Sequence, residues 1–343
     1  MRATRRPGPR LVHAFSLVRP RDLVAATASA ARAGRTDAAV EWIAGGTDMV
    51  PLLREAVRRP SQLVDLQGVV PATIEVEAEA VWIGAGATMA DVAEDPAIRA
   101  RLPVVTEALL ASASPQVRNL ATIGGNLLQR TRCPYFRDVG VPACNKRAPG
   151  SGCAALEGDS RPHAVLGVST DCVAAHASDL AVALVALDTF VHTAGRSGER
   201  RMALAGLYRL PSDTPHVETA LDTGEVITMI EVRAGAAPRR SHYLKLRDRA
   251  SFEWALVSAA VALDLAGGEI RDVRVAAGGV GTVPWRLRNV EAGLVGRPWA
   301  PATLRQAASR AIEGAVSRPQ NAFKLDLLPR VIVRALETIG GPV

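Results

Sequence analysis

Aromatic residues are scarce in this chain of 343 residues, and long uninterrupted apolar runs are missing. Phe, Trp and Tyr make up 4% of the sequence, which is too few to stack bases along a nucleic-acid groove, so the net charge of +7 does not indicate DNA or RNA as a partner. No stretch approaches the roughly 18–20 uncharged apolar residues of a membrane span. The excess of 41 Lys and Arg over 34 Asp and Glu is almost all arginine and predicts a basic protein surface.

The N-terminus has little of what a secretory signal requires. Residues 1–14 are basic, and the segment from Leu11 to Arg21 is interrupted by polar residues and a proline before any apolar core of 7–15 residues can form. We therefore expect no export signal in this chain. That leaves two locations open, the cytoplasm, or the periplasm by export together with a signal-bearing partner subunit.

Motifs of hydrolytic and nucleotide-binding enzymes are also missing. The sequence contains no Gly-x-Ser-x-Gly or His-Glu-x-x-His motif, its six histidines are scattered, and neither Gly-x-Gly-x-x-Gly nor a Walker loop is present. We therefore predict no catalytic acid or base residue and favour a redox role in which a cofactor carries the reaction. At roughly 100–200 residues per domain, the length predicts two domains.

Cysteine is rare but clustered, because all four cysteines lie within forty consecutive residues: Cys133, Cys144, Cys153 and Cys172. A disulfide framework is not expected in a chain of this size, and the spacing C-x10-C-x8-C-x18-C lacks the C-x2–4-C pairs of zinc ribbons. Long irregular spacing suits a loop wrapped around a metal cluster. His163 could replace one ligand, although a single loop histidine is more often at the surface or a hydrogen-bonding residue. Six cations near the cysteines are expected to offset thiolate charge: Arg130, Arg132, Arg137, Lys146, Arg147 and Arg161.

Apolar periodicity predicts an α+β chain rather than a doubly wound sheet. The expected helices cover 21–33, 48–57, 90–94, 104–113, 180–187, 301–316 and 326–339, and the expected strands cover 39–44, 63–66, 73–77, 81–83, 189–192, 257–265 and 270–275. The three strands between 63 and 83 are expected to share one half-buried mixed sheet. Gly267 and Gly268 predict a hairpin turn, and a domain boundary is expected near 235–240.

Two double-glycine turns are the main candidates for a binding site. The first runs from Ala44 to Asp48 between a strand and a helix, and the second runs from Arg118 to Asn126. Backbone amides without a Cβ approach anions closely there, although either turn alone is more often a plain tight turn. The presence of both turns in one domain favours the binding of a dinucleotide pyrophosphate. A third cluster, Gly278–Gly281, predicts a bend after a strand.

Together these segments resemble the FAD-binding (medium) subunit of the xanthine dehydrogenase family of molybdenum hydroxylases. The resemblance rests on residues 44–48, 118–126 and 178–180 and extends from about Phe15 to the last helix. The segments around the cysteines, listed last, are similar to the subgroup that carries an extra 4Fe-4S cluster in this subunit, as in periplasmic aldehyde oxidoreductase and, more distantly, 4-hydroxybenzoyl-CoA reductase: 126–133, 144–147, 150–153 and 172–176. One departure is Ala177, where close relatives carry proline.

The resemblance implies a fold as well as a family. A basic extension over 1–14 would precede a two-lobed FAD-binding domain of the vanillyl-alcohol-oxidase (PCMH) type over 15–238, with the 4Fe-4S loop inserted at 126–172. An α+β domain like that of carbon monoxide dehydrogenase flavoproteins would follow over 239–343.

The resemblance also implies site residues. Asp179 would hold the adenosine part of FAD, and Lys245 would lie near the flavin ring. The four cysteines would bind the 4Fe-4S cluster. The FAD pyrophosphate and ribityl chain would be held by two sets of residues, Ala44, Gly45, Gly46, Thr47 and Asp48 in the first turn and Thr122, Gly124, Gly125 and Asn126 in the second.

The implied function is electron transfer within a heterotrimer. A large molybdopterin-binding subunit would oxidise an aldehyde or N-heterocycle, and a small 2Fe-2S subunit would pass electrons to FAD in this chain, which hands them to an acceptor that the sequence does not identify. Two other interpretations remain open. One is a self-contained flavin oxidase of the same fold, and the other is a non-enzymatic zinc-loop interaction module.

Overall fold

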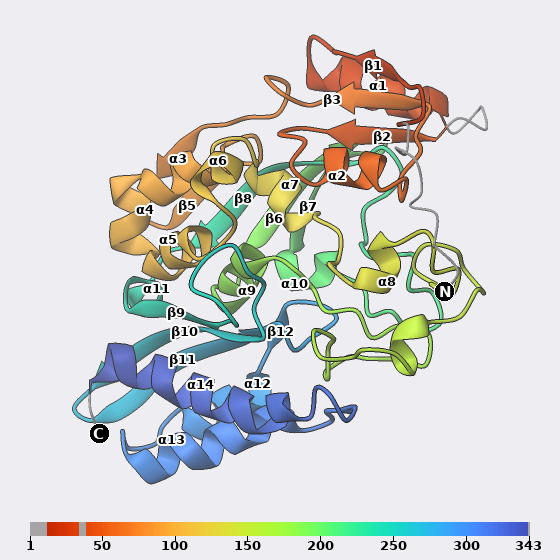
Figure 1. Ribbon diagram of the computed structural model, residues 1–343. Coiled ribbons are helices and arrows are strands. Elements are labelled where there is room, and N and C mark those ends of the chain that lie inside the picture. The colour runs from red at the N-terminus through yellow and green to blue at the C-terminus, as the bar shows by residue number, and fades with distance from the viewer. Residues whose placement is uncertain (1–11, 34–38, 342–343) are drawn as a thin grey trace.

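The computed structural model describes residues 12–33 and 39–341, so most of the predicted basic extension, and Gly34 after the first helix, lie outside the described residues. Figure 1 shows three β-sheets in succession, a small one near the N-terminal end, a larger one in the middle and a third covered by the C-terminal helices. None of the described helices combines the length and apolar character that crossing a bilayer requires.

The first sheet is a small parallel one that carries the first glycine turn. Its strands are β1 (Ser16–Val18), β3 (Gln62–Asp65) and β2 (Val40–Ile43), in that order, with α1 (Leu23–Ala33) between β1 and β2 in sequence. The turn follows β2 and leads into α2 (Met49–Arg54). The predicted strand and helix are both confirmed. The helix is shorter than predicted, and Ala56, just beyond it, adopts a positive φ of 59°.

The central sheet is antiparallel throughout. Its order is β4 (Ile74–Val76), β5 (Ala80–Gly84), β8 (Val226–Arg233), β6 (Phe190–Gly195) and β7 (Gly198–Ala203). The prediction of one mixed sheet over 63–83 is therefore wrong, because β3 pairs in the first sheet whereas β4 and β5 pair in this one. Alternation of apolar residues identifies strands but carries no information on distant partners such as β8.

Helices pack against the central sheet and fill the main core. They are α3 (Met89–Glu94), α4 (Pro96–Arg101), α5 (Pro103–Leu110), α6 (Pro115–Arg118), α7 (Ile123–Leu127), α9 (Asp179–Ala186) and α10 (Leu204–Leu207). Every residue of α9 is buried. The predicted cap of α9 is confirmed, because the Ser178 side chain accepts a hydrogen bond from the Ala181 amide at 2.9 Å.

The third sheet is antiparallel, in the order β12 (Trp285–Arg286), β11 (Glu269–Gly278), β10 (Val257–Ala266) and β9 (Ser241–Leu246). The predicted hairpin between β10 and β11 is confirmed, with Gly267 and Gly268 both at positive φ. The remaining helices are α11 (Ala236–Arg239), α12 (Arg288–Leu294), α13 (Pro301–Ala308) and α14 (Phe323–Gly340). The helix predicted over 301–316 is shorter than expected, because α13 passes into a 3₁₀ turn, η2 (Ser309–Ile312).

The cysteine segment is the long irregular loop that the sequence predicts. It contains only short helical turns, α8 (Pro134–Arg137) and η1 (Ala154–Leu156), among the residues from 128 to 172. Its later part lies against the third sheet, because the amides of Val165 and Leu166 both donate to the Val280 carbonyl, at 2.8 and 2.9 Å. The later part of this segment therefore packs against the C-terminal part of the chain.

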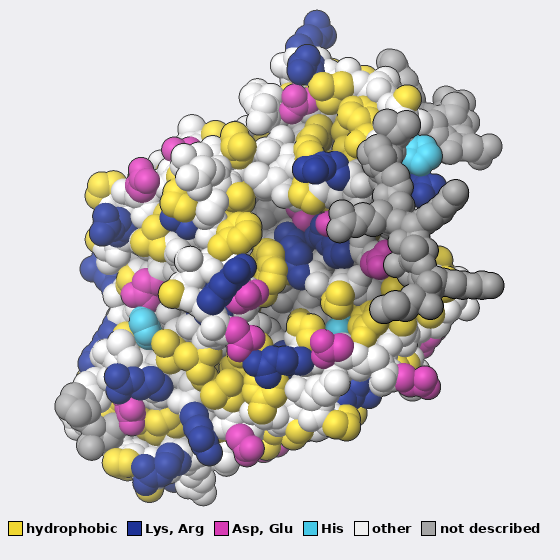
Figure 2. Space-filling view, in the orientation of Figure 1, with side chains coloured by type: hydrophobic (Ala, Val, Ile, Leu, Met, Phe, Trp, Pro, Cys, Tyr) yellow, Lys and Arg dark blue, Asp and Glu magenta, His cyan; other side chains and the backbone are white. Residues whose placement is uncertain are grey.

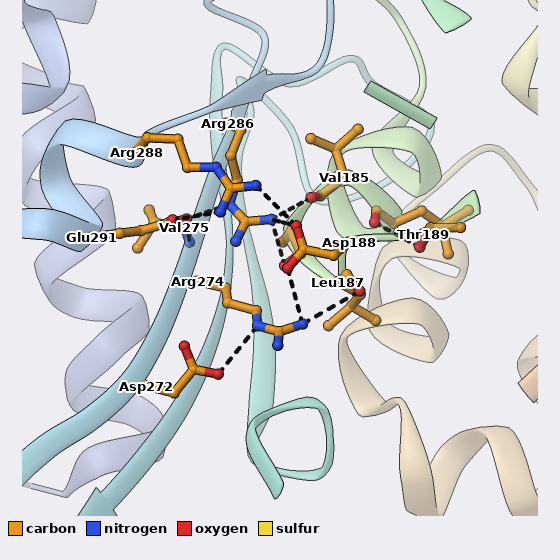
Figure 3. Close-up of polar contacts among 12 residues, drawn as sticks. Val185, Leu187, Asp188, Thr189, Asp272, Arg274, Val275, Arg286, Arg288 and Glu291 are labelled. Atoms are coloured by element: carbon orange, nitrogen blue, oxygen red, sulfur yellow. Dashed lines mark hydrogen bonds and ion pairs between the residues drawn. The ribbon is translucent and has the colours of Figure 1, made fainter. Parts of the chain in front are cut away.

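One carboxylate connects the end of α9 to the third sheet (Figure 3). Asp188 forms ion pairs with Arg274 of β11, Arg286 of β12 and Arg288 of α12, at 3.0–3.2 Å. Arg286 also donates to the carbonyls of Val185 and Ala186 at the end of α9. The division into domains over 15–238 and 239–343 stays a prediction.

Candidate functional site

A cavity of about 560 Å³ lies between the first sheet and the central sheet, within the size range of cofactor sites. Hydrophobic side chains lie beside Lys and Arg side chains in the middle of the face shown in Figure 2, below the lobe of β1–β3. The cavity brings together both predicted glycine turns. Nine predicted FAD residues line it: Ala44, Gly45, Gly46, Thr47, Asp48, Thr122, Gly124, Gly125 and Asn126.

The first turn presents backbone donors to this cavity. Among the described residues, the amides of Gly45, Gly46 and Thr47 have no hydrogen-bond partner in the protein. Gly46 has a φ of 71°, which favours glycine. Three adjacent amides without acceptors form a cradle that suits an anion such as a pyrophosphate.

The two turns approach each other so closely that a side chain would not fit between them. A Cβ on Gly45 would lie 1.7 Å from the carbonyl oxygen of Leu120, and a Cβ on Gly124 would lie 3.0 Å from the Cβ of Ala85. The second turn is also fixed from within, because Thr122 caps α7 by accepting from the Gly125 amide at 3.2 Å. Gly45 is therefore required for the contact between the turns, and Gly124 is required for the contact of the second turn with Ala85.

Asp48 connects the first glycine turn to the cysteine segment. Its carboxylate accepts from the Arg130 amide at 2.8 Å and pairs with the guanidinium groups of Arg132 at 3.0 Å and Arg137 at 2.7 Å. It begins α2 without making a capping hydrogen bond. The side chain thus holds the cysteine segment, while the residue itself lines the cavity.

Asp179 and Lys245 are brought together by the structure, but they are not among the residues that line the main cavity. The Lys245 ammonium lies 2.7 Å from the Asp179 carboxylate, and both side chains are buried. The same carboxylate accepts from Ser112 at 2.9 Å and from the Tyr243 hydroxyl at 2.5 Å. Burial and the adjacent carboxylate raise the pKa of Tyr243 well above its usual value. Ser112 lines the cavity, so this ion pair lies directly behind its wall. The roles of Asp179 and Lys245 toward FAD stay predictions.

The four cysteines surround a second, very small cavity of about 10 Å³. All four are free thiols; Cys133, Cys144 and Cys172 are buried and Cys153 is half-buried. Burial, with smaller contributions from the neighbouring Cys144 and Cys172, raises the pKa of Cys133 to about 12, although hydrogen bonds from the Phe136 and Tyr135 amides oppose the shift. A buried thiol such as that of Cys133 must lose its proton to bind a metal.

Polar side chains hold this part of the loop. Asn145 accepts from the Gly152 amide at 2.8 Å and donates to Asp171, which brings the segments of Cys144, Cys153 and Cys172 together. Arg147 donates to the carbonyls of four residues of the loop, Tyr135, Phe136, Asp138 and Val141. The loop is therefore organised by its own hydrogen bonds.

Four cysteines are a donor set that either a zinc ion or an iron–sulfur cluster can take. No group of three or more His, Cys, Asp or Glu side chains in the described part of the chain is arranged to hold a single metal ion. Zinc at about 2.3 Å from each sulfur would bring the thiolates to within about 3.8 Å of one another. A four-iron cluster takes four cysteine ligands, which is the number that lines this cavity, and the cluster stays a prediction.

The predicted charge compensation around the cysteines is largely wrong. Lys146 does lower the pKa of Cys172. It also donates to Glu218, however, and the other five cations are held by carboxylates or carbonyls. Arg130 pairs with Glu218, Arg132 with Asp48, Arg137 with Asp48 and Glu55, Arg161 with Asp248, and Arg147 with the loop carbonyls. The cations lie near the cysteines in the sequence, but the acidic residues that pair with them come from distant segments.

A contact between the main cavity and the cysteine segment is not evident from the sequence. The Arg132 guanidinium lies 4.5 Å from the ring centre of Trp254, and both residues line the main cavity and a neighbouring one of about 210 Å³. Burial lowers the pKa of Arg132 to about 10. Cys133 and His163 line the neighbouring cavity too, so it joins the two sites. The one sequence signal for this contact is the position of Arg132 next to Cys133.

Residues 13–233 match the family described as the FAD binding domain in molybdopterin dehydrogenase, and residues 241–339 match the CO dehydrogenase flavoprotein C-terminal domain. The chain is 46% identical over 269 residues to the aldehyde oxidoreductase FAD-binding subunit PaoB of Escherichia coli K12, covering 78% of this chain and 83% of that protein. It is 24% identical over 295 residues to the glyceraldehyde dehydrogenase medium chain of Sulfolobus acidocaldarius, covering 86% of each.

Solved structures show the same fold. Carbon monoxide dehydrogenase from Hydrogenophaga pseudoflava, in a form that lacks the Mo-pyranopterin moiety, superposes with a TM-score of 0.74 at 24% identity, over 96% of this chain and 98% of the other. Quinoline 2-oxidoreductase from Pseudomonas putida 86 gives 0.73 at 23% identity over the same shares. The predicted fold class is confirmed.

Proposed function

The chain belongs to the FAD-binding medium subunits of the molybdenum hydroxylase family, and from that premise we propose that it carries both FAD and a 4Fe-4S cluster as the electron-transfer subunit of an aldehyde-oxidising complex. The aldehyde assignment follows the similarity to an aldehyde oxidoreductase subunit. The proposed partners are a large molybdopterin-binding subunit and a small 2Fe-2S subunit, since the relatives include medium chains of carbon monoxide and glyceraldehyde dehydrogenases.

One observation carries the cluster assignment. Four free thiols from distant points of one loop line the same small cavity, and the loop that bears them is joined to the glycine turn through Asp48. Cys133, Cys144, Cys153 and Cys172 would each supply one thiolate. A structural role as buried apolar residues does not require four thiols around one cavity.

In this proposal, the residues of this chain bind, orient and shield FAD and the cluster. The amides of Gly45, Gly46 and Thr47 would donate to the phosphate oxygens of FAD. Trp254 and Arg132 form the wall between the main cavity and the cavity that reaches Cys133. When bound, FAD supplies a carrier for two electrons and two protons, and the cluster supplies a carrier for single electrons.

In the proposed complex, the substrate is oxidised outside this chain. Oxidation of an aldehyde with oxygen from water yields a carboxylic acid, two protons and two electrons. The 2Fe-2S subunit would deliver both electrons to the FAD bound here, and an external acceptor would remove them. Substrate binding is assigned to the large subunit.

Cofactor analysis of the purified complex tests the proposal. We expect FAD and four iron atoms per chain, with flavin absorption and a broad iron–sulfur band that dithionite bleaches. Cys153→Ser should lose cluster iron but retain FAD. Ala148→Ser is the matched control, because it places a serine on an exposed site of the same loop and leaves all four thiols in place.

Three results would contradict the proposal. Stoichiometric zinc without flavin would indicate a zinc-loop module. Aldehyde turnover by this chain alone would indicate a self-contained flavin oxidase. Unchanged iron content in Cys153→Ser would refute the ligand set.

A further inference from the structure

One histidine lies against a cysteine sulfur inside the site. The Nε2 atom of His163 is 3.2 Å from the sulfur of Cys133, and its side chain is buried, with an exposed fraction of 1%. Its ring stacks on Tyr135, at 5.9 Å between ring centres and 24° between planes. The ring is therefore fixed in position beside one of the four thiols.

The backbone of His163 is held by the C-terminal domain. Its carbonyl accepts from the ammonium group of Lys324 at 2.8 Å, and the same ammonium donates to the Gly279 carbonyl at 2.6 Å. Lys324 is completely buried. The His163 amide in turn donates to the Ser160 carbonyl at 3.0 Å. Burial of a lysine ammonium group costs free energy. That α14 nevertheless buries Lys324 against the His163 carbonyl indicates that the position of this loop residue matters.

The contact determines which ring nitrogen carries the proton. A metal-bound thiolate presents lone pairs, so an unprotonated Nε2 at this distance would be repelled, whereas Nε2–H donates a hydrogen bond. The other nitrogen, Nδ1, is buried without a partner among the described residues, which agrees with this tautomer because an Nδ1–H would have no acceptor for its hydrogen bond.

We propose that His163 is a positioning residue of the cysteine site, whose Nε2–H donates a hydrogen bond to the Cys133 thiolate and so raises the reduction potential of the cluster held there. This inference rests on the proposed function, since it requires the cluster. Hydrogen bonds to cluster sulfurs stabilise the more negative, reduced state. His163 thus makes the cluster a better electron acceptor.

Potentiometric titration of the cluster in the complete complex, followed by EPR, tests the inference. In His163→Leu the ratio of reduced to oxidised cluster at a fixed potential should fall about tenfold, which is a shift of about 59 mV to lower potential for a one-electron couple. His163→Gln keeps an N–H donor and should recover at least half of the shift. His216→Leu, the same substitution at an exposed histidine near Cys172, should leave the potential unchanged.

A measurement on unsubstituted protein covers the case in which the variants lose the cluster. With ¹⁵N introduced only in histidine, pulsed EPR of the reduced cluster should detect a weak nitrogen coupling that is lost in His163→Gln. Absence of the coupling, a strong coupling typical of a nitrogen bound to iron, or an unchanged potential in iron-replete His163→Leu would overturn the inference and leave the proposed function intact. A complex without iron would overturn both.

Discussion

Replacement of Gly45 by alanine is the most direct test of the contact between the two glycine turns. The new Cβ would lie 1.7 Å from the Leu120 oxygen and 2.5 Å from its carbonyl carbon. Both are backbone atoms, so no side-chain rotation relieves the clash. A Cβ does not approach such atoms closer than 3.0 Å, and the turns must separate by about 1.3 Å.

The separation moves the cradle amides by a large fraction of a hydrogen-bond length. A hydrogen bond to a charged group contributes about 1.5–3 kcal/mol, so each lost bond to a phosphate weakens FAD binding about 10- to 150-fold. We expect Gly45→Ala to bind FAD at least tenfold more weakly, as measured by reconstitution of the apoprotein with fluorescence detection, and to unfold at a lower temperature.

The matched control is Gly206→Ala, because a Cβ there meets no atom within 4 Å. It should leave FAD affinity and stability unchanged. Comparison at the same folded fraction separates loss of binding from loss of fold. Wild-type FAD affinity in folded Gly45→Ala would refute the role of the close approach and of the first turn as the phosphate site.

Three further predictions concern carboxylates. Asp48→Asn should lower cluster iron more than FAD in cofactor analysis, because it weakens the pairing with Arg132 and Arg137; equal loss of both would contradict this. Asp188→Asn should lower the unfolding temperature in calorimetry more than Asp272→Asn, which removes a single ion pair, and equal effects would refute the role of Asp188 as a connector. Hydrogen bonds from Arg201 lower the pKa of Glu231 to about 2 from a usual 4.5, so its stabilisation is complete above pH 4.5 and is lost as the pH falls toward 2. Glu231→Gln should flatten the acid limb of the unfolding curve in that window, and an unchanged limb would contradict the assignment.

Local features of the fold were predictable from the sequence, whereas pairings between distant segments were not. Ser178 before an apolar run predicts the capped helix α9, and Gly267-Gly268 predicts the hairpin, because both depend on neighbouring residues. The partner of β5 is β8, roughly 150 residues further along, and nothing in the alternation of β5 specifies it. The sequence therefore predicts strands better than sheets.

The same distinction applies to the site. The two glycine turns and the four cysteines were found from composition and spacing, and the structure brings each set together. The contact of His163 with Cys133 and its support by Lys324 depend on the packing of α14 against the loop. Asp179 and Lys245 were predicted as separate contacts to FAD, whereas the structure pairs them with each other. Side-chain partners across elements are decided by tertiary packing.

The attachment of the cysteine loop to the C-terminal domain has a consequence for biosynthesis. His163 receives its hydrogen bond from Lys324, 161 residues later in the chain. At about 5–20 residues per second, a ribosome needs roughly 8 to 30 s to make that stretch. During this time the loop that bears the four thiols has been made, but its contact with Lys324 does not yet exist. The support of His163 by the C-terminal helix α14 therefore forms only after nearly the whole chain has been translated, whereas the hydrogen bonds within the loop can form earlier.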